Sequence, residues 1–384
     1  MISVSVMAPW KVPLADVRLP EEDIDAVAET LRSGWLSMGP RTEELEEALA
    51  RYTGARHALA VASGTAALHL LCLAVGLGPG DEVVVPSMTF VATVNAIAYT
   101  GAKPVFADIA GIAQPWLATS SVRAALTPRT RAVMTVAYGG HPGEARALRD
   151  LGDAHGLALL EDAAHAIGAR DGGRQIGTLG AGGAYSFFAN KNLAIGEGGA
   201  LTTDDDEIAE RARLLRSHGM TTLTWDRHRG HASGYDVVAR GFNYRIDEPR
   251  AALALRRLER LDAENRRRHA LDVRYREGIA SIAGVTPTDP PPVGDGALPA
   301  HHLFTVVLDR DVDRAAVRAA LAARGVQTSV HYPPAHLFSI YADGAPALPH
   351  TEEYAARTMT LPMFAGMSEG QQDLVLEALG EALG

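Results

Sequence analysis

The feature that most constrains this chain is an alternation, between residues 55 and 205, of short apolar runs with helix-like segments. Helical patterns occupy 90–101 and 143–156, and Gly156 is expected to end the second helix. Apolar strands separated by helices predict a mostly parallel central sheet covered by helices on both faces, an α/β/α arrangement. The runs that predict strands are DEVVVPS (81–87), KPVFADI (103–109), RAVMTVAYGG (131–140), LALLEDAA (157–164), GAYSFFA (183–189) and GALTTD (199–204).

The C-terminal part of the chain has a different pattern, which predicts a second, smaller α+β domain. Its expected elements are a long amphipathic helix (248–279), a Pro/Gly-rich stretch (286–302), a strand (302–309), a helix (313–325) and a strand (326–332). A chain of 384 residues is long enough for two domains. We place the larger at 1–250, with an N-terminal arm of about 1–35, and the smaller at 251–384.

Composition excludes several classes of protein. The net charge of −10 argues against binding to nucleic acid or to anionic membranes. Cys72 is the only cysteine, so no disulfide framework or thiolate metal cluster is expected, and the histidines have no convincing zinc spacing. No apolar run reaches the roughly 18–20 residues of a membrane helix, and the N-terminus lacks a signal-peptide pattern. The expected setting is the cytoplasm.

In parallel sheets the ligand lies beyond the carboxyl ends of the strands. Candidates for such a site are the residues that directly follow an apolar run: Ser63–Thr65, Phe90, Asp162 and Lys191. The Ser-Gly-Thr at 63–65 stands directly before a helical pattern, where free amides and the helix dipole favour a phosphate. The alternative is an ordinary helix N-cap.

Asp162 follows the apolar run LALL, and His165 lies three residues further on. A partly buried carboxylate needs a cationic or donor partner, or its pKa rises. A protonated heteroaromatic nitrogen would be such a partner. An N-cap aspartate beside a satisfied histidine remains the alternative.

Lys191 is one of three lysines, so arginine supplies the other 33 of the 36 basic residues (36 − 3). Arginine cannot act as a deprotonated amine, whereas a lysine in an apolar site can lose its proton and form a Schiff base. The alternative for Lys191 is an ordinary solvated lysine in a loop. Ser186, five residues earlier, could offer a hydroxyl to a phosphate. A phosphate cradle, an aspartate, an aromatic ring at Phe90 and a Schiff-base lysine together match the needs of pyridoxal 5′-phosphate.

Longer blocks carry a resemblance to a known family. They include SGWLSMGPRTEELEEALARYTGARHALAVASGTAALHL, GDEVVVPSMTFVATVNAI, EDAAHAIGA, SFFANKNLAIGEGGALTTDD, RSHGM, GFNYRIDE, VHYPPAHLFSIY and LPMFAGMSE. In their order and spacing they resemble the DegT/StrS-type sugar aminotransferases, which are fold-type-I pyridoxal-phosphate enzymes. The resemblance covers nearly the whole chain.

The resemblance implies a role for each matching position. Lys191 would form the internal aldimine and act as acid and base, Asp162 would pair with the pyridine nitrogen, and His165 would lie near the ring. The remaining cofactor residues would be Gly64, Thr65 and Ser186 at the phosphate, Phe90 stacked on the ring, and Asn243 reaching the phosphate of the neighbouring subunit. The minimum functional unit would then be a homodimer with shared active sites.

The resemblance also implies a reaction. The expected substrate is a keto sugar, a dTDP- or UDP-linked keto-deoxyhexose, which receives an amino group from L-glutamate in deoxysugar, antibiotic or cell-surface glycan biosynthesis. The candidates for sugar contact are His331, Tyr332 and His336. Phe364 and Ala137 stand where many relatives have histidine and could line the cleft. The alternatives are a keto-cyclitol (scyllo-inosose-like) aminotransferase that uses L-glutamine, and a non-catalytic regulator that keeps the fold.

Overall fold

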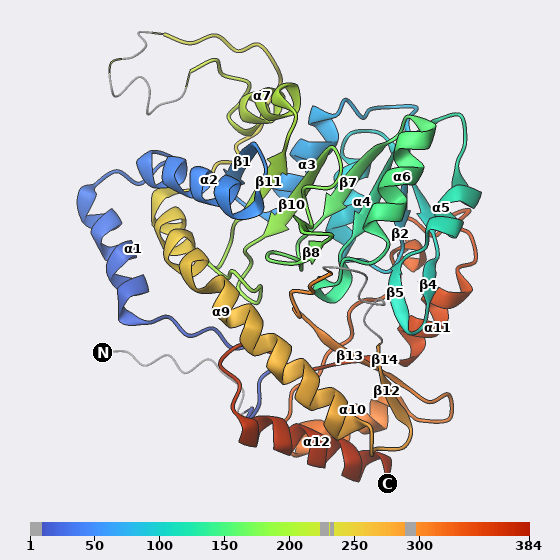
Figure 1. Cartoon of the computed structure of the whole chain (residues 1–384). Helices are drawn as coiled ribbons and strands as arrows, with labels where there is room; N and C mark the ends of the chain where they lie inside the picture. The colour runs from blue at the N-terminus through green and yellow to red at the C-terminus, as the bar shows by residue number, and fades with distance from the viewer. Residues whose placement is uncertain (1–9, 223–229, 231–233, 289–296) are drawn as a thin grey trace.

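A seven-stranded sheet forms the centre of the computed structural model, which describes residues 10–222, 230, 234–288 and 297–384 (Figure 1). In spatial order its strands are β1 (His57–Val61), β11 (Gly199–Thr203), β10 (Gly182–Ser186), β7 (Ala158–Asp162), β6 (Thr130–Val136), β2 (Glu82–Pro86) and β3 (Lys103–Ala107). The five strands from β10 to β3 are parallel. Only β11 is antiparallel to its neighbours in this sheet, β1 and β10, so the expectation of a mostly parallel sheet is confirmed.

All six strands predicted between residues 81 and 204 are present, each within a few residues of its expected bounds. The seventh, β1, was not among them. Its sequence HALAV contains a single β-branched residue, so the local pattern is weak. Pairing with β11 along all five residues fixes it at the edge of the sheet.

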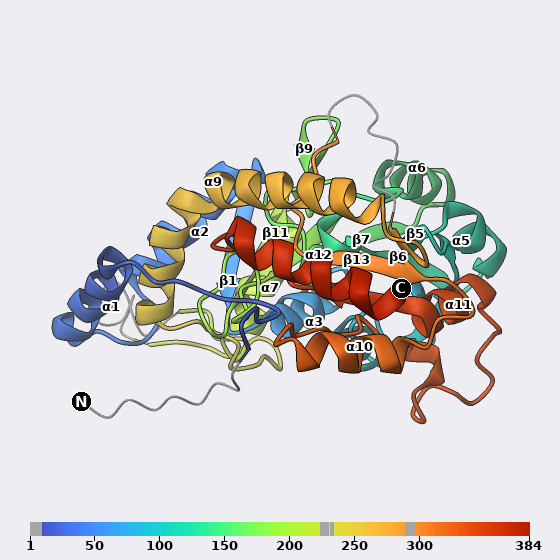
Figure 2. The same ribbon diagram turned by 90° about the horizontal axis from the view of Figure 1, so that it is seen from below.

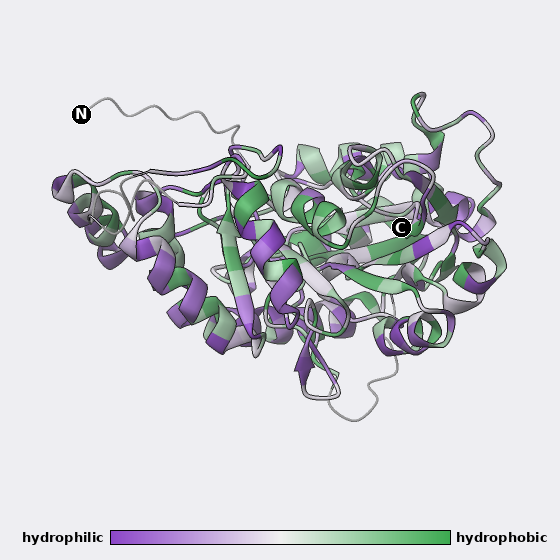
Figure 3. Ribbon diagram, turned by 90° about the horizontal axis from the view of Figure 1, so that it is seen from above, coloured by the Kyte–Doolittle hydropathy of each residue, from purple (hydrophilic) through white to green (hydrophobic). Residues whose placement is uncertain are grey.

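Successive strand residues belong to cores on opposite faces of the sheet, as the two-residue period of a strand requires. In β2, Val83 and Val85 lie in one core while Val84 lies in another, and all three are fully buried. The first face is covered by α3 (Gly64–Ala74), α4 (Val91–Ala98) and α7 (Asp206–Arg216). The opposite face is covered by α2 (Pro40–Thr53), α5 (Thr119–Ala125), α6 (Ala145–His155) and part of α9. Figure 3 shows the resulting pattern, with hydrophobic strands inside and hydrophilic bands on the outer helices.

The long helix α9 (Glu248–Ile279) has the bounds that the sequence predicts. The side chain of Asp247 accepts a hydrogen bond from the amide of Arg250, and a proline in the first turn suits a helix start. Its first half packs into the core of the large sheet, and its second half packs into a separate core. Figure 2 shows α9 running beside α12 (Glu369–Leu383) along the molecule.

The second core belongs to a three-stranded antiparallel sheet. It consists of β12 (Val285–Pro287), β13 (Phe304–Leu308) and β14 (Thr358–Leu361), with α10 (Arg314–Ala323) and α12 packed on it. This agrees with an α+β arrangement after α9. The domain boundary near residue 250 stays a prediction, because α9 contributes to both cores.

The strand predicted at 326–332 is wrong. Val326 and Ser329 make only isolated bridges, to Val12 and Thr360. Ser329 meets the outer edge of β14 through two backbone hydrogen bonds with Thr360, but the contact is a single bridge and does not extend into a strand.

The remaining elements are short or peripheral. They are α1 (Glu21–Ser33), α11 (Pro349–Arg357), the hairpins β4–β5 (Ile109–Gly111 and Gln114–Leu117) and β8–β9 (Arg170–Asp171 and Arg174–Gln175), and two 3₁₀ turns at Tyr138–Gly140 and Ala335–Leu337. Among the described helices, none has both the length and the apolar character that crossing a membrane requires.

Candidate active site

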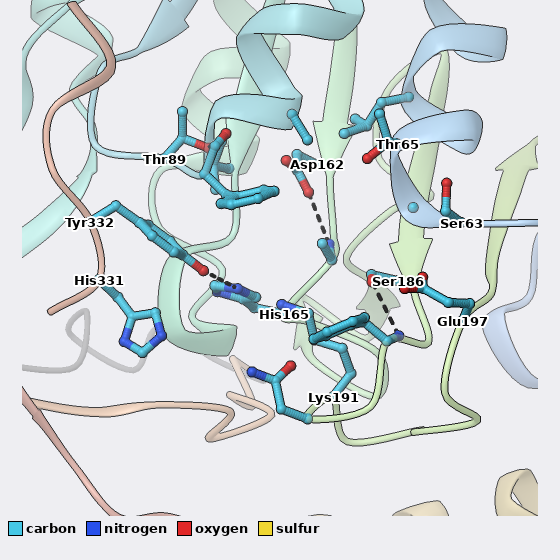
Figure 4. Close-up of a pocket in the computed structure, with 18 residues that line it drawn as sticks. Ser63, Thr65, Thr89, Asp162, His165, Ser186, Lys191, Glu197, His331 and Tyr332 are labelled. Atoms are coloured by element: carbon cyan, nitrogen blue, oxygen red, sulfur yellow. Dashed lines mark hydrogen bonds between the residues drawn. The ribbon is translucent and has the colours of Figure 1, made fainter. Parts of the chain in front are cut away.

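A cavity of about 400 Å³ lies beyond the carboxyl ends of the parallel strands (Figure 4). Residues that follow β1, β2, β7 and β10 converge on it, together with a segment near residue 331. It collects nine of the predicted site residues: Gly64, Thr65, Phe90, Asp162, His165, Ser186, Lys191, His331 and Tyr332.

The amino end of α3 forms one wall of the cavity. Ser63 caps the helix, because its Oγ accepts the amide of Ala66 at 3.1 Å. Gly64 lies so close to Ser186 that a Cβ added to it would be 2.8 Å from the Ser186 Cβ. The amides of a first helical turn have no partners within the helix, so this wall is suited to an anion. The N-cap and anion interpretations of 63–65 are therefore compatible.

Asp162 ends β7 at the base of the cavity and is only 5% exposed. Its Oδ2 accepts from Thr93 Oγ1 at 2.6 Å, and its Oδ1 accepts from the amide of Ala164 at 3.0 Å. Burial raises the pKa of Asp162, while these two hydrogen bonds and the charge of Lys191 oppose the rise. A cationic donor at this carboxylate would offset the cost of its burial.

Lys191 lies in the loop between β10 and β11, half-buried in the cavity. Its amide donates to the carbonyl of Phe188 at 2.9 Å, which gives the loop a tight turn. Burial lowers the pKa of the Lys191 ammonium to about 8, although the charge of Asp162 acts in the opposite direction. A substantial fraction of this amine is therefore neutral near pH 8 and able to act as a nucleophile or base.

His165 and Tyr332 form a polar pair whose hydrogen-bond direction can be deduced. The amide of Gly139 donates to His165 Nδ1 at 3.3 Å, so this nitrogen is an acceptor. Burial and the charge of Lys191 lower the pKa of His165, so its ring is neutral and carries its proton on Nε2. That proton is donated to the Tyr332 hydroxyl, 3.0 Å away. Figure 4 marks this hydrogen bond with a dashed line. The phenol, whose pKa burial raises, keeps its own proton for a further acceptor.

These groups fit pyridoxal 5′-phosphate. The first turn of α3 and the neighbouring Ser186 suit a phosphate, and the buried carboxylate of Asp162 suits a protonated ring nitrogen. The lysine with a lowered pKa suits an aldehyde.

Two predicted residues lie elsewhere. His336 does not line the cavity: it is 1% exposed, its Nδ1 lies 2.6 Å from Ser87 Oγ, and its ring supports the fold. The prediction that it contacts the sugar is therefore corrected. Asn243 is exposed and does not line the cavity of its own chain; its backbone pairs with Ser217.

The two positions that depart from the family pattern are also away from the cavity. Ala137 and Phe364 are 3% and 1% exposed, and each packs into an apolar core. Neither lines the cleft as the sequence suggested.

Sequence reasoning missed Thr93 and Asn192. Thr93 holds Asp162 from 69 positions away, and Asn192 bonds to Asn265 and His302, which lie 73 and 110 positions away. A threonine in an apolar helix and an asparagine in a loop carry no local signal of such partners. The adjacency of Asn192 to Lys191 was the only available indication.

Comparisons with known proteins identify the family of this chain. The model of the DegT/DnrJ/EryC1/StrS aminotransferase family matches residues 17–380. The spore coat polysaccharide biosynthesis protein SpsC of Bacillus subtilis (strain 168) is 41% identical over 387 residues, which cover 97% of this chain and 96% of that protein.

Two solved structures are similar over nearly their whole length. S. venezuelae DesV, in complex with a ketimine intermediate, has a TM-score of 0.88 and 40% identity over 97% of this chain and 98% of that chain. DesI, in the presence of its TDP-sugar product, has a TM-score of 0.86 and 35% identity over 98% and 93% of the two chains. This chain belongs to the DegT/DnrJ/EryC1/StrS family of sugar aminotransferases, whose members use pyridoxal 5′-phosphate.

Proposed function

We propose that this enzyme transfers an amino group from L-glutamate to the ketone of a nucleotide-linked keto-deoxyhexose. The observation that carries the proposal is that Lys191, with a pKa of about 8, shares one cavity with the buried carboxylate of Asp162 and the amino end of α3. The similarity to DesI, solved with its TDP-sugar product, supports a nucleotide-linked substrate. The similarity to SpsC supports a role in polysaccharide biosynthesis.

Bound pyridoxal 5′-phosphate supplies an aldehyde that condenses with amines and a ring that withdraws electrons from the bond being broken. The amino end of α3 and Ser186 would hold its phosphate. Asp162 would keep the ring nitrogen protonated, and Thr93 orients that carboxylate through its 2.6 Å hydrogen bond. Phe90, which is exposed and lines the cavity, would cover the face of the ring.

Lys191 moves the proton in both half-reactions. As a neutral amine it would take a proton from the α-carbon of the donor, and the resulting ammonium ion would return that proton to the former aldehyde carbon of the cofactor. In the second half-reaction, with the keto sugar in place of the donor, Lys191 would make the same two proton transfers in reverse order. The neutral His165 and Tyr332 offer a hydrogen-bond donor, not a charge, to an oxygen in the cavity.

A homodimer with shared sites is part of the proposal. Asn243 is exposed outside the cavity of its own chain, and Val237 and Val238 nearby are 53% and 57% exposed. Exposed apolar side chains beside a polar residue are typical of an interface with a second copy. Asn243 of the partner subunit would then complete the phosphate site.

The proposal is tested by loading the protein with pyridoxal phosphate and adding L-glutamate. We expect a cofactor absorbance band that glutamate bleaches and that a dTDP- or UDP-linked keto-deoxyhexose restores. Restoration by a keto-cyclitol alone, after L-glutamine, would identify the cyclitol reaction in its place. Absence of any band would overturn catalysis altogether.

A further inference from the structure

A second cavity, of about 260 Å³, adjoins the active site. The two cavities share Asn190 and Lys191 as lining residues. The second is lined by the segment before α1, by the loop after β14 and by one face of α9. We call it the arginine pocket, after its four guanidinium groups: Arg18, Arg257, Arg260 and Arg268.

The arginines of α9 share one face because they are spaced by three and by eight residues. Arg257 and Arg268 are each 5% exposed. Buried arginines are costly unless their charge and their N–H groups find partners. The next question is therefore whether each of these arginines has a partner within the protein.

The carboxylates around the pocket are already engaged. Glu264 pairs with Arg257 at 3.2 Å, Asp23 with Arg260 at 2.6 Å, and Asp16 with Arg18 at 3.6 Å. Of the four guanidinium groups, one is therefore left without a carboxylate partner among these three pairs.

The uncompensated charge is that of Arg268. Within the described part of the chain its hydrogen-bond partner is the carbonyl of Met363, 3.0 Å from Nη1, and it forms no ion pair. Burial lowers the pKa of Arg268 to about 10, and the neighbouring charge of Arg257 adds to the effect while Glu264 opposes it. The group is still a cation at neutral pH.

Three buried polar atoms of residues that line the pocket have no partner among the described residues. They are the Nε atoms of Arg257 and Arg268 and the Oδ1 atom of Asn190. Buried polar groups in folded proteins are nearly always hydrogen-bonded. Two donors on a positive wall suit the oxygens of an anion.

We propose that the arginine pocket binds an anionic oxygen group of the substrate whose reacting carbon lies at Lys191. The group is a carboxylate of the amino donor or a phosphate of the nucleotide-linked sugar, and either can accept from guanidinium N–H groups. The inference rests on the proposed function, since that places the reacting carbon at Lys191. It adds a subsite formed by α9 and the segment before α1.

Two measurements on the holoenzyme distinguish the two sources. The first is the L-glutamate concentration that half-saturates bleaching of the cofactor band. The second is the dissociation constant of dTDP, measured by calorimetry. In Arg268→Gln we expect one of these constants to rise about tenfold, because one charge-assisted hydrogen bond to the anion is lost. The other constant should stay within about twofold of the wild-type value.

Arg314→Gln is the matched control. Arg314 also donates to main-chain carbonyls, those of Ala355 and Thr358, but it lies in the small α+β region away from both cavities. This variant should leave both constants unchanged. No change in Arg268→Gln, or an equal change in both constants, overturns the inference.

Arg18→Ala is a second variant, which tests the inference even if Arg268→Gln does not fold. The Arg18 side chain is 72% exposed, so its loss spares the core, and we expect a rise of roughly threefold in the same constant. If wild-type enzyme does not respond to glutamate at all, the proposed function fails, while dTDP binding still reports on the pocket. If the variants change only the dimer equilibrium, the pocket binds a second copy and the inference is wrong.

Discussion

Lys191 offers the sharpest test at the scale of single residues. We expect Lys191→Arg to lower turnover by at least about 10²–10⁴-fold, because a guanidinium cannot give up a proton near neutral pH. Borohydride reduction of the wild-type holoenzyme should fix the cofactor to the peptide that contains Lys191. In the variant no peptide should carry it.

Lys103→Arg is the matched control, since Lys103 is exposed on β3 and does not line either cavity. It should retain full activity and the labelled Lys191 peptide. A Lys191→Arg enzyme that turned over at a comparable rate would contradict the proposed proton transfer.

The lowered pKa of Lys191 predicts a pH dependence. Only the neutral amine reacts with acetic anhydride, so labelling of Lys191 in the cofactor-free protein should rise with pH and reach half its maximum near pH 8. The negative charge of Asp162 stabilises the ammonium form. Asp162→Asn should therefore shift the midpoint to lower pH, as measured by mass spectrometry of the labelled peptides. A midpoint shifted upward would contradict this electrostatic account.

The residues suited to the chemistry could be predicted from the sequence better than the residues that hold them in place. Asp162 and Lys191 could be found because each follows an apolar strand and each has a side chain suited to one chemical task. Thr93 could not, since its hydroxyl matters only through a 2.6 Å contact that the folded sheet creates. His336 was misplaced because a histidine in a motif does not reveal where its ring points.

At the scale of elements, the loop that carries Lys191 is held by Asn192. This side chain is 3% exposed, and its Nδ2 donates to Asn265 Oδ1 and to the carbonyl of Ala300, each at 2.8 Å. Its Oδ1 accepts from His302 Nδ1 at 3.1 Å. The loop is thereby tied to α9 and to the segment before β13.

Asn192→Ala should lower the free energy of unfolding by roughly 1–3 kcal/mol, because it leaves these buried partners unpaired. It should also lower kcat more than it raises the KM for glutamate, since Lys191 loses its fixed position. Urea denaturation and steady-state kinetics measure the two effects. Asn190→Ala, two residues earlier, removes an Oδ1 that has no partner among the described residues and should cost less than about 0.5 kcal/mol.

The approach of β11 to the amino end of α3 depends on Gly199. A Cβ at this position would meet only backbone atoms, 2.6 Å from the Ser63 carbonyl carbon and 2.7 Å from the Gly64 nitrogen. Gly199→Ala should therefore lower the free energy of unfolding by about 1–3 kcal/mol and weaken cofactor binding. Gly78→Ala is the control, because nothing lies within 4 Å of its added Cβ. Equal thermal stability of the two variants would contradict the packing argument.

How well each element could be predicted depended on how much of its stability is local. The helix α9 was found to the residue because a capped start and a long amphipathic pattern belong to its own sequence. The direction of β11 was not expected, since a strand's orientation is decided by β1 and β10 on either side of it. The segment 326–332 has a strand-like composition, but its backbone pairs only at isolated bridges, Val326 with Val12 and Ser329 with Thr360, and composition does not reveal where such pairing stops.

At the scale of the whole molecule, two cores meet along α9, and the active-site cavity takes residues from both sides of that junction. Lys191 and Asp162 belong to the large sheet, whereas His331 and Tyr332 come from the chain after α10. Movement between the two parts would therefore change the distance between the lysine and the phenol. The proposed dimer adds a third source of residues.

Mixing two defective variants tests the shared site. In a Lys191→Ala/Asn243→Ala heterodimer, one site would combine Lys191 of one subunit with Asn243 of the partner subunit and would be complete. The other site would lack both. Each homodimer would lack one group in both of its sites.

Random reassociation makes half of the dimers mixed, and each mixed dimer has one complete site. The mixture should therefore recover about a quarter of the wild-type activity, provided that each variant alone is nearly inactive. Measurement requires co-expression or dissociation and reassociation, with mass photometry to confirm the dimer. Activity equal to the mean of the two separate variants would mean that each chain completes its own site.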